Sequence, residues 1–520
     1  MSGKQKTKAT VLVVLDGWGV AKPSKNNAIT QAGPLFFDHL AANYPAQILA
    51  ASGEAVGLPA GIFGNSEVGH LTLGAGRVVY QDLLRINQAI KDGEFFKNKE
   101  LLAAAQKVKK TGGAWHLAGL ASDGQVHSSL EHLFSLLDLA KRLKIKKVFL
   151  HLFLDGRDTS RSSGAKFVAA VEGACRRFGV GKISTLSGRF YAMDRDNHWE
   201  RIAPVYEAMV NRQGQRYLSA TAALKASYQA KIYDEEFVPA LIEGGASVKE
   251  GDVLIFFNYR ADRARQLSRA FTDKNFKTQE FRLQRFKNLD FISFTNYDKK
   301  LPLKVVFPPF VLKNCLGEIL SKHHKKQLRV AETEKYAHVT YFFNGGREKP
   351  FVGEDRILIP SPRVLSYAKK PQMSAAAVAG AVVDSLKTNK YSFILVNFAN
   401  PDMVGHTGNL EATIKAVQAA DRGLKRIVKA VLKEGGDILI VADHGNADSL
   451  YDSRRQEIIK EHTTNPVPFI WVSSASLLDS PSRLSLHNKK PSGTLIDIAP
   501  TVLKIQKITP PSQMSGKSLI

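Results

Sequence analysis

Cysteine, long apolar segments and acidic charge are all scarce in this chain of 520 residues. Its two cysteines, Cys175 and Cys315, exclude a disulfide framework and a cysteine-type zinc site, and we expect a cytoplasmic location. No stretch approaches the roughly 18 to 20 apolar residues of a membrane helix, so we expect no membrane span. The basic N-terminal stretch Met1 to Lys8 precedes an apolar run, Val11 to Leu15, that is too short for a signal peptide.

The shortage of acidic residues gives a formal net charge of +25, from 73 Lys and Arg against 48 Asp and Glu. Part of the excess lies in residues 269–329, which hold 14 basic and 5 acidic residues. Such a balance favours nucleic acid, acidic membranes or small anions as partners. No RNA-binding aromatic motif, zinc finger or helix-turn-helix accompanies it, so we expect a solvated basic surface and no specific nucleic-acid partner.

Short apolar segments that end in polar loops recur along the chain. Residues 10–15 predict a buried strand that ends at Asp16 in a glycine loop, and further strands are predicted at 114–120, 147–154, 182–187 and 252–257. Predicted helices alternate with them, and the sequence Ser128-Ser129-Leu130-Glu131 indicates a capping box. This order is typical of a doubly wound α/β sheet with a polar crevice at the carboxyl ends of its strands.

Arginine gathers at the ends of the strands predicted in the first half of the chain. Guanidinium groups bind phosphate and carboxylate bidentately, so several arginines at neighbouring strand ends suit a small, multiply charged anion. The candidate anion-binding residues are Arg157, Arg189, Arg195, Arg260 and Arg263, together with His127 and Asp158.

Carboxylates and imidazoles follow the strands predicted in the second half, beyond a proline-containing connector at residues 301–309. Aspartate and histidine are natural ligands of divalent metals such as manganese and zinc. The candidate ligands are Asp16 from the first strand, with Asp402, His406, Asp443, His444 and His462. Six such residues are enough for two metal ions.

A serine stands in the glycine-framed loop Gly64-Asn65-Ser66-Glu67-Val68-Gly69-His70. Glycine lets a backbone approach its neighbours closely, so the loop can present one hydroxyl to a ligand. A serine hydroxyl is a weak nucleophile until a base or a metal activates it. We therefore expect Ser66 to complete one metal shell and to act as a nucleophile.

These motifs together resemble one family, the cofactor-independent (2,3-bisphosphoglycerate-independent) phosphoglycerate mutases of the alkaline phosphatase superfamily. The resemblance rests on the Ser66 loop and on seven further segments in the family's order: residues 15–19, 155–158, 258–263, 334–340, 402–406, 443–446 and 462–466. It therefore covers nearly the whole chain.

The resemblance implies two divalent metal ions, usually Mn²⁺, one held by Asp16, Ser66, Asp443 and His444, and the other by Asp402, His406 and His462. It implies that Ser66 is the phosphorylated nucleophile, that Lys335 assists it, and that Asp158 is a general acid or base. Phosphoglycerate would be bound by His127, Arg157, Asp158, Arg189, Arg195, Arg260, Arg263 and Lys335.

A split layout also follows from the resemblance. Residues 1–80 and 312–520 would form the metal-binding phosphatase domain, with an inserted transferase domain at residues 81–311. The expected activity is interconversion of 3-phosphoglycerate and 2-phosphoglycerate by a monomer in glycolysis and gluconeogenesis. The sequence departs from the family's usual residues at Gln125, Ser129 and Asp448, where glycine, histidine and glutamate are common.

Two alternatives stay open at this point. The first is a phosphatase or another phosphomutase of the same superfamily, with the same metal ligands and a different substrate crevice. The second is a basic nucleic-acid-binding protein that retains a catalytically inactive enzyme fold. The arginines at strand ends argue against the first, and the complete ligand set argues against the second.

Overall fold

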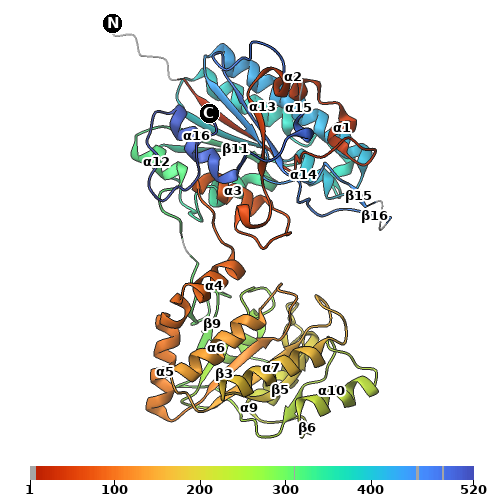
Figure 1. Ribbon diagram of the computed structural model, residues 1–520, viewed down its shortest axis with the longest axis vertical. Helices are drawn as coiled ribbons and strands as arrows, with labels where there is room; N and C mark the ends of the chain where they lie inside the picture. The colour runs from red at the N-terminus through yellow and green to blue at the C-terminus, as the bar shows by residue number, and fades with distance from the viewer. Residues whose placement is uncertain (1–7, 310, 453–455, 483–484) are drawn as a thin grey trace. The chain divides into compact units, whose positions relative to one another are not determined.

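The chain folds into two compact units, each built on one eight-stranded sheet (Figure 1). Unit 1 comprises residues 1–80 and 310–520, and unit 2 comprises residues 81–309. This computed structural model describes residues 8–309, 311–452, 456–482 and 485–520, so Met1 to Thr7 of the basic N-terminal stretch lie outside the described residues. No helix in the described part of the chain is long and apolar enough to cross a membrane.

The sheet of unit 1 is mostly parallel. Its strands lie in the order β12 (Glu354–Ile359), β11 (Gln327–Glu332), β13 (Phe393–Phe398), β1 (Thr10–Leu15), β14 (Asp437–Val441), β17 (Val467–Val472), β2 (Ala46–Ala50) and β18 (Gly493–Thr494). The first five strands run parallel, whereas β17 is antiparallel to both β14 and β2. The loop before β17 therefore lies at the same sheet edge as the loops after β1, β13 and β14.

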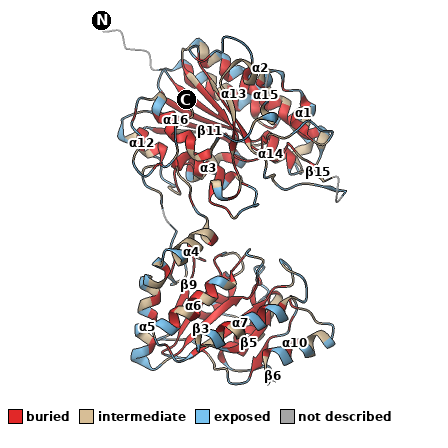
Figure 2. Cartoon of the chain, in the orientation of Figure 1, coloured by how far each residue is buried: buried red, intermediate tan, exposed pale blue. Residues whose placement is uncertain are grey.

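Two groups of helices flank this sheet (Figure 1). Helices α13 (Ala375–Lys387) and α15 (Leu410–Lys433) pack against each other, and α1 (Ala28–Ala32), α2 (Leu35–Asn43) and α14 (Asn400–Gly405) pack on α15. Helix α3 (Ser66–Ala75) packs with α12 (Leu316–Lys322) and α16 (Ile498–Ile505). Because helices cover the sheet, β1, β11 and β13 are buried along their whole length (Figure 2). This explains the mostly apolar character of β1 and β13, whereas β11 also buries Gln327, Arg329 and Glu332.

Unit 2 has a second sheet of the same kind. Its strands lie in the order β10 (Lys304–Val305), β9 (Asp290–Ser293), β8 (Val253–Phe256), β3 (Trp115–Leu120), β4 (Val148–Leu154), β5 (Lys182–Gly188), β7 (Ala240–Ile242) and β6 (Gln215–Tyr217). All strands from β10 to β5 are parallel, and β7 runs antiparallel to β5. The carboxyl ends of β8, β3, β4 and β5 thus meet at one edge. A separate two-stranded sheet in unit 1 pairs β15 (Tyr451–Asp452) with β16 (Glu457–Ile458).

Successive residues of these strands face two different cores. Leu117 of β3 belongs to a cluster that includes Leu101 and Leu133, whereas its neighbour Ala118 belongs to a second cluster with Ile202. The first core is covered by α4 (Asp82–Lys91), α5 (Lys99–Thr111), α6 (Leu130–Arg142), α7 (Gly164–Phe178) and α10 (Ala220–Gln229), and the second by α9 (Trp199–Val210) and α11 (Arg265–Thr272). The predicted mixed α/β class with mainly parallel sheets is confirmed.

One local prediction is wrong. Helix α6 begins at Leu130 after Ser129, but the side chain of Ser129 makes no capping hydrogen bond. The hydroxyl of the preceding residue, Ser128, instead donates to the carbonyl of Leu120 at 2.5 Å. The expected capping box is therefore absent, because the Ser128 hydroxyl fastens the loop to the end of β3.

A chain of four buried polar side chains crosses the sheet of unit 2. Asp252 Oδ2 lies 3.1 Å from His116 Nε2, His116 Nδ1 lies 2.9 Å from His151 Nε2, and His151 Nδ1 lies 2.9 Å from the hydroxyl of Thr185. If His116 donates to the carboxylate, its Nδ1 must accept from His151, and His151 Nδ1 must accept from Thr185. Each imidazole is then neutral, and its tautomer is fixed by its neighbours.

This arrangement predicts that unit 2 loses stability in mild acid. Burial, followed by the neighbouring His116, holds the pKa of His151 well below its usual value, so the unfolded chain binds the extra proton first. The free energy of unfolding should fall as pH drops below about 6.5, by up to about 1.4 kcal/mol per pH unit for this histidine. Urea unfolding at pH 7.5 and 5.5 measures the effect. Between pH 7.5 and 5.5, the free energy of unfolding should fall less in His151→Gln than in the unmodified protein. The exposed control His39→Gln should show the same fall as the unmodified protein. An equal fall in all three proteins would contradict the prediction.

Candidate metal centre and anion-binding cluster

Four neighbouring parallel strands of unit 1 deliver charged side chains to one edge of the sheet. Asp16 follows β1, Asp443 and His444 follow β14, and Asp402 lies in α14 directly after β13. Lys335 ends a short 3-10 helix, Thr333–Lys335, that follows β11. All five side chains are buried, because helices and loops cover this edge.

Ser66 is brought to the same place by the start of helix α3. The side chain of Asn65 caps the helix by accepting from the backbone amide of Val68 at 2.9 Å. The helix lies so close to the end of β14 that a Cβ on Gly69 would come within 2.7 Å of the Asp443 backbone oxygen. Glycine is thus required there for a close approach, which places Ser66 among the carboxylates.

The hydroxyl of Ser66 is the meeting point of three groups. It donates to Asp16 Oδ1 at 3.2 Å, lies 2.9 Å from His444 Nε2, and accepts from the ammonium of Lys335 at 2.6 Å. Its position at the first turn of a ten-residue helix also exposes it to the partial positive charge of the helix N-terminus. Both the lysine and the helix favour negative charge on this oxygen or on a group attached to it.

The ammonium of Lys335 also contacts two carboxylates of this cluster. It lies 2.7 Å from Asp16 Oδ1 and 2.6 Å from Asp402 Oδ2. Burial alone would lower the pKa of Lys335, but the two carboxylates outweigh it and raise that pKa. Burial would likewise raise the pKa of Asp16, yet Lys335 and then His444 hold it well below its ordinary value. The lysine and the aspartate are therefore both charged at neutral pH.

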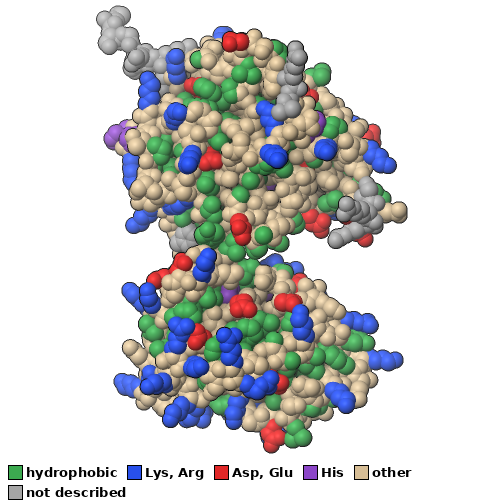
Figure 3. Space-filling view, viewed as in Figure 1, with side chains coloured by type: hydrophobic (Ala, Val, Ile, Leu, Met, Phe, Trp, Pro, Cys, Tyr) green, Lys and Arg blue, Asp and Glu red, His purple; other side chains and the backbone are tan. Residues whose placement is uncertain are grey.

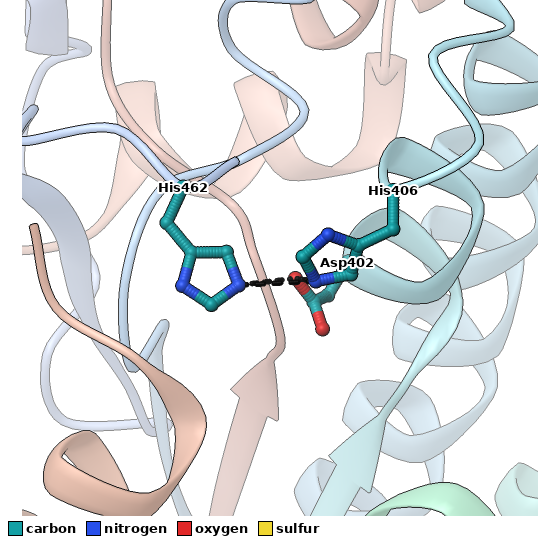
Figure 4. A group of neighbouring side chains, drawn as sticks. All are labelled: Asp402, His406 and His462. Carbon is teal, nitrogen blue, oxygen red and sulfur yellow. Dashed lines mark hydrogen bonds and ion pairs between the residues drawn. The ribbon is translucent and has the colours of Figure 1, made fainter. Parts of the chain in front are cut away.

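A second group of ligands converges beside the first (Figure 4). His406 Nε2 and His462 Nε2 lie 3.1 Å apart, and they lie 3.2 and 3.3 Å from Asp402 Oδ1. The Nδ1 atom of each ring lies within hydrogen-bond distance of a backbone carbonyl, of Lys460 at 2.6 Å and of Gly64 at 2.8 Å. Since a carbonyl only accepts, the proton of each neutral ring is on Nδ1, and both Nε2 atoms turn a lone pair towards the carboxylate. Three converging electron-pair donors fit a bound cation.

The group around Ser66 fits a cation for a different reason. Its carboxylates carry more negative charge than the neighbouring positive groups compensate. His70 Nδ1 lies 3.2 Å from Asp443 Oδ2, but its hydrogen bond goes to the carbonyl of Ser66 at 2.9 Å. Asp443 Oδ2 is consequently a buried oxygen without a hydrogen-bond partner. Three buried carboxylates and one lysine leave an uncompensated charge that a divalent ion would neutralise.

Unit 2 gathers the predicted arginines around a separate set of carboxylates. Arg189 Nη1 donates to Asp155 Oδ1 and to Asp158 Oδ2, each at 2.6 Å, and Arg189 Nη2 lies 3.0 Å from His127 Nε2. Since a guanidinium only donates, His127 Nε2 accepts and its proton resides on Nδ1. Burial and then Arg189 lower the pKa of His127 to about 4, so this ring is neutral.

Asp262 joins the other predicted residues into the same cluster. Its Oδ2 accepts from Arg195 Nη1 at 3.1 Å. Arg260 Nε forms an ion pair with its Oδ1 at 3.1 Å, and Oδ1 also lies 3.7 Å from His127 Nδ1. These facing atoms, Asp262 Oδ1 and His127 Nδ1, are both buried without a hydrogen-bond partner. A small shift of either side chain would let His127 Nδ1 donate its proton to Asp262 Oδ1. Asp262 thus pairs with two arginines and also faces the ring of His127.

The side chains of Arg157 and Arg263 lie nearby and have other partners. Arg157 Nη2 pairs with Glu235 at 2.5 Å, and Arg263 Nη1 donates to the carbonyl of Met193 at 3.1 Å. With Arg189, both line a cavity of about 120 Å³. The structure thus assembles the sequence-predicted residues into two clusters, the seven ligand candidates with Lys335 in unit 1 and the anion-binding candidates in unit 2.

Several residues of the unit 1 cluster were absent from the sequence prediction. His70 lies one helical turn after Ser66, and the amide of Asn397 donates to Asp16 Oδ2 at 2.8 Å and lies 3.1 Å from His70 Nε2. Asn446 donates to Asp402 Oδ1 at 2.9 Å. The four-residue spacing from Ser66 could have indicated His70, because such residues share a helix face. Asn397 lies inside an apolar strand, where one amide gives little signal.

Comparison with known proteins identifies the family of this chain. A phosphoglycerate mutase of Moorella thermoacetica, named 2,3-bisphosphoglycerate-independent, is 51% identical over 514 residues, which is 98% of each chain. A relative of the same name from Synechocystis is 48% identical and covers 98% of this chain and 95% of its own. The chain belongs to this family of mutases.

Further comparisons agree with that assignment. The family description "BPG-independent PGAM N-terminus" matches residues 86–299, and "Type I phosphodiesterase / nucleotide pyrophosphatase" matches residues 325–490. The solved phosphoglycerate mutase of Leishmania mexicana, crystallised at low cobalt concentration, is 30% identical with a TM-score of 0.61 and covers 99% of this chain and 98% of its own. The family assignment and the two clusters together point to divalent metal in unit 1.

Two departures from the family's usual residues have structural explanations. Gln125 has a φ of 54°, a left-handed conformation that glycine adopts at less cost, which explains why glycine is common there. Asp448 is buried and accepts from Thr463 Oγ1 at 2.9 Å and from Asn465 at 2.6 Å. It therefore fastens the segment that carries His462. The exchange of histidine for Ser129 has no explanation in this structure.

Removal of one imidazole should weaken metal binding directly. His462→Ala leaves His406 and Asp402 as the remaining donors of the second group, and we expect the affinity for Mn²⁺ at this site to fall at least about tenfold. Titration against a chelating dye measures the binding without any activity assay. The exposed His324→Ala variant is the matched control and should bind as the unmodified protein does; equal affinity in His462→Ala would remove His462 from the metal shell.

Proposed function

We propose that this chain interconverts 3-phosphoglycerate and 2-phosphoglycerate without added 2,3-bisphosphoglycerate, and that Ser66 carries the phosphate between the two halves of the reaction. The observation that carries the proposal is the Ser66 hydroxyl itself, which is held at a helix N-terminus within 2.6 Å of a buried ammonium. The near full-length identity to named mutases supports the same reaction. The mutase family match over residues 86–299, within unit 2, counts against the phosphatase alternative.

Seven residues of unit 1 are proposed to hold two divalent ions, and the proposed metal is Mn²⁺. Asp16, Ser66, Asp443 and His444 would hold one ion, and Asp402, His406 and His462 the other. Bound metal would withdraw charge from the phosphoryl oxygens and lower the pKa of the serine hydroxyl. Unit 1 is accordingly proposed to be the phosphatase-like domain, and unit 2, residues 81–309, the phosphoglycerate-binding domain inserted into it.

The first chemical step is proposed to be an in-line displacement. A bond forms between Ser66 Oγ and phosphorus, the bond from phosphorus to the glycerate oxygen breaks, and the electron pair leaves with that oxygen. Overall, the serine loses a proton and glycerate gains one. Lys335, which is charged at neutral pH, offsets the negative charge that develops on the phosphoryl group. The reverse step on the other glycerate hydroxyl regenerates Ser66.

The cluster in unit 2 is proposed to hold the glycerate during the exchange. Arg157, Arg189, Arg195, Arg260 and Arg263 would bind its anionic groups, with His127 beside them. Asp158 is the proposed general acid and base, because its Oδ2 accepts from Arg189 and its side chain is 21% exposed, so a glycerate hydroxyl could reach it. We also propose that the protein is cytoplasmic, which its two free cysteines support. We propose further that it is a monomer, and size-exclusion chromatography tests this.

Ser66→Ala should abolish the mutase activity, because no other hydroxyl contacts Lys335 in the described structure. We expect the rate of 2-phosphoglycerate formation, measured in Mn²⁺ without 2,3-bisphosphoglycerate, to fall at least about 10⁴-fold. Mass spectrometry of the unmodified protein mixed with substrate should find phosphate on the peptide containing Ser66.

Three results would overturn the proposal. They are substantial turnover in Ser66→Ala, a strict requirement for 2,3-bisphosphoglycerate, or release of inorganic phosphate as fast as the substrate is consumed. The variant Ser474→Ala is a suitable control for handling, because Ser474 is an exposed serine in the turn after β17.

Asp262→Asn should lower kcat more than it raises KM. The amide keeps the shape of the carboxylate but loses the charge that orients Arg195 and Arg260, while the same loss makes the site more attractive to an anion. We expect kcat to fall about tenfold and KM for phosphoglycerate to change less than about threefold. Steady-state kinetics test this, with Asp262→Glu restoring part of kcat. A large rise in KM at unchanged kcat would contradict a positioning role.

A further inference from the structure

The parallel strands of unit 2 have a second edge, opposite the arginine cluster, and lysine dominates it. Strands β3, β4 and β5 begin there, at Trp115, Val148 and Lys182. Helix α5 ends just before β3, and the loop after α6 leads directly into β4. We call the lysines of these segments the basic edge: Lys109, Lys110, Lys144, Lys146, Lys147 and Lys182, all of them exposed.

The basic edge has few carboxylates to neutralise it. None of its six lysines forms an ion pair with another residue in the described part of the chain; Lys147 donates only to the carbonyl of Gly112. The acids near the starts of β8 and β9 have partners of their own. Asp252 is buried against His116, Asp290 is paired with Lys107 and Lys304, and the exposed Glu250 accepts from the backbone amides of Lys287 and Asn288. On the far side, Glu243 follows the antiparallel strand β7 and bounds the patch.

Helix stabilisation explains only part of this charge. Lys109 and Lys110 lie in the last turn of α5, where a cation offsets the helix dipole. Lys144, Lys146 and Lys147 lie in the loop beyond α6, and Lys182 is the first residue of a strand, so no helix end accounts for them. Figure 3 shows that Lys and Arg side chains also outnumber acidic ones on the visible face of this unit.

We propose that the basic edge binds the phosphate backbone of nucleic acid without sequence preference. Strands lie about 4.8 Å apart, so the row from β3 to β5 extends about 10 Å, and the adjoining helix ends widen it, which suits several consecutive phosphates of a single strand. An acidic membrane is the weaker partner, because Leu218, directly after β6, is the one exposed large apolar side chain at this edge among the described residues, and a single leucine inserts little apolar surface into lipid.

The mode of contact follows from the side chains present. Lysine neutralises phosphates as a point charge and reads no base edges, and no exposed aromatic ring lies in the basic edge on which a base could stack. Binding should therefore be weak, indifferent to sequence and steeply dependent on salt. This inference concerns a surface outside the proposed catalytic cluster and does not rest on the proposed function.

The test uses the full chain and a fluorescent single-stranded RNA of about 20 uridines, with binding followed by anisotropy at several salt concentrations. The test variant combines Lys110→Gln, Lys146→Gln and Lys182→Gln. The control combines Lys369→Gln, Lys429→Gln and Lys433→Gln, three exposed lysines of unit 1 with the same change in net charge. We expect the affinity of the test variant to fall at least about tenfold at low salt, and the slope of log affinity against log salt to shrink by about 2. Mutase activity should be the same in all three proteins.

Each contrary result overturns the inference. If the control loses as much affinity as the test variant, the net charge and not the basic edge attracts RNA. If saturating 3-phosphoglycerate displaces the RNA, the RNA occupies the arginine cluster. If the protein sediments with phosphatidylserine vesicles and does not bind RNA, the surface serves a membrane. Retained RNA binding of the unmodified protein in excess substrate, with the loss confined to the test variant, supports it.

Discussion

The ammonium of Lys335 is the contact on which the unit 1 cluster depends. It lies within 2.7 Å of Asp16 and Asp402 and within 2.6 Å of the Ser66 hydroxyl, in a region closed to solvent. Carboxylates this deeply buried would be protonated without compensation. The lysine keeps them ionised, and so keeps them available as ligands. The parallel strands make this possible, because the four neighbouring strands β11, β13, β1 and β14 end at the same edge and together contribute five side chains.

The two clusters use opposite electrostatic designs. In unit 1 the buried carboxylates exceed their cationic partners, which leaves room for divalent ions. In the unit 2 cluster four of the five arginines already have an acidic partner: Arg157 has Glu235, Arg189 has Asp155 and Asp158, and Arg195 and Arg260 share Asp262. These pairs hold the guanidinium groups in place before an anion arrives. An incoming substrate therefore meets oriented donors, and the cost of ordering long side chains has largely been met during folding.

The sequence predicted most of this, for a reason that particular residues illustrate. Asp16 and Asp443 follow short apolar runs, and the rule that parallel strands end at one edge brings them together. His462 was harder to place, because it approaches that edge from the start of an antiparallel strand, β17. Asn397, buried inside β13, and Asp262, hidden among arginines, gave no separate signal. Ser128 and Glu131 matched a capping box that the structure does not use. A local sequence pattern cannot show that the carbonyl of Leu120, which is distant in that pattern, lies within reach of the Ser128 hydroxyl.

The two edges of the unit 2 sheet can act independently, and distance explains why. The strands between them contain six or seven residues, which separates the basic edge from the arginine cluster by about 20 Å at about 3.3 Å per residue. Exposed charges are largely screened beyond about 8 Å at physiological salt. A polyanion at the basic edge would then leave the potential at the arginines nearly unchanged. The arginines are also held by local carboxylates, so the basic edge is free to accumulate charge without disturbing the chemistry at the opposite ends of the same strands.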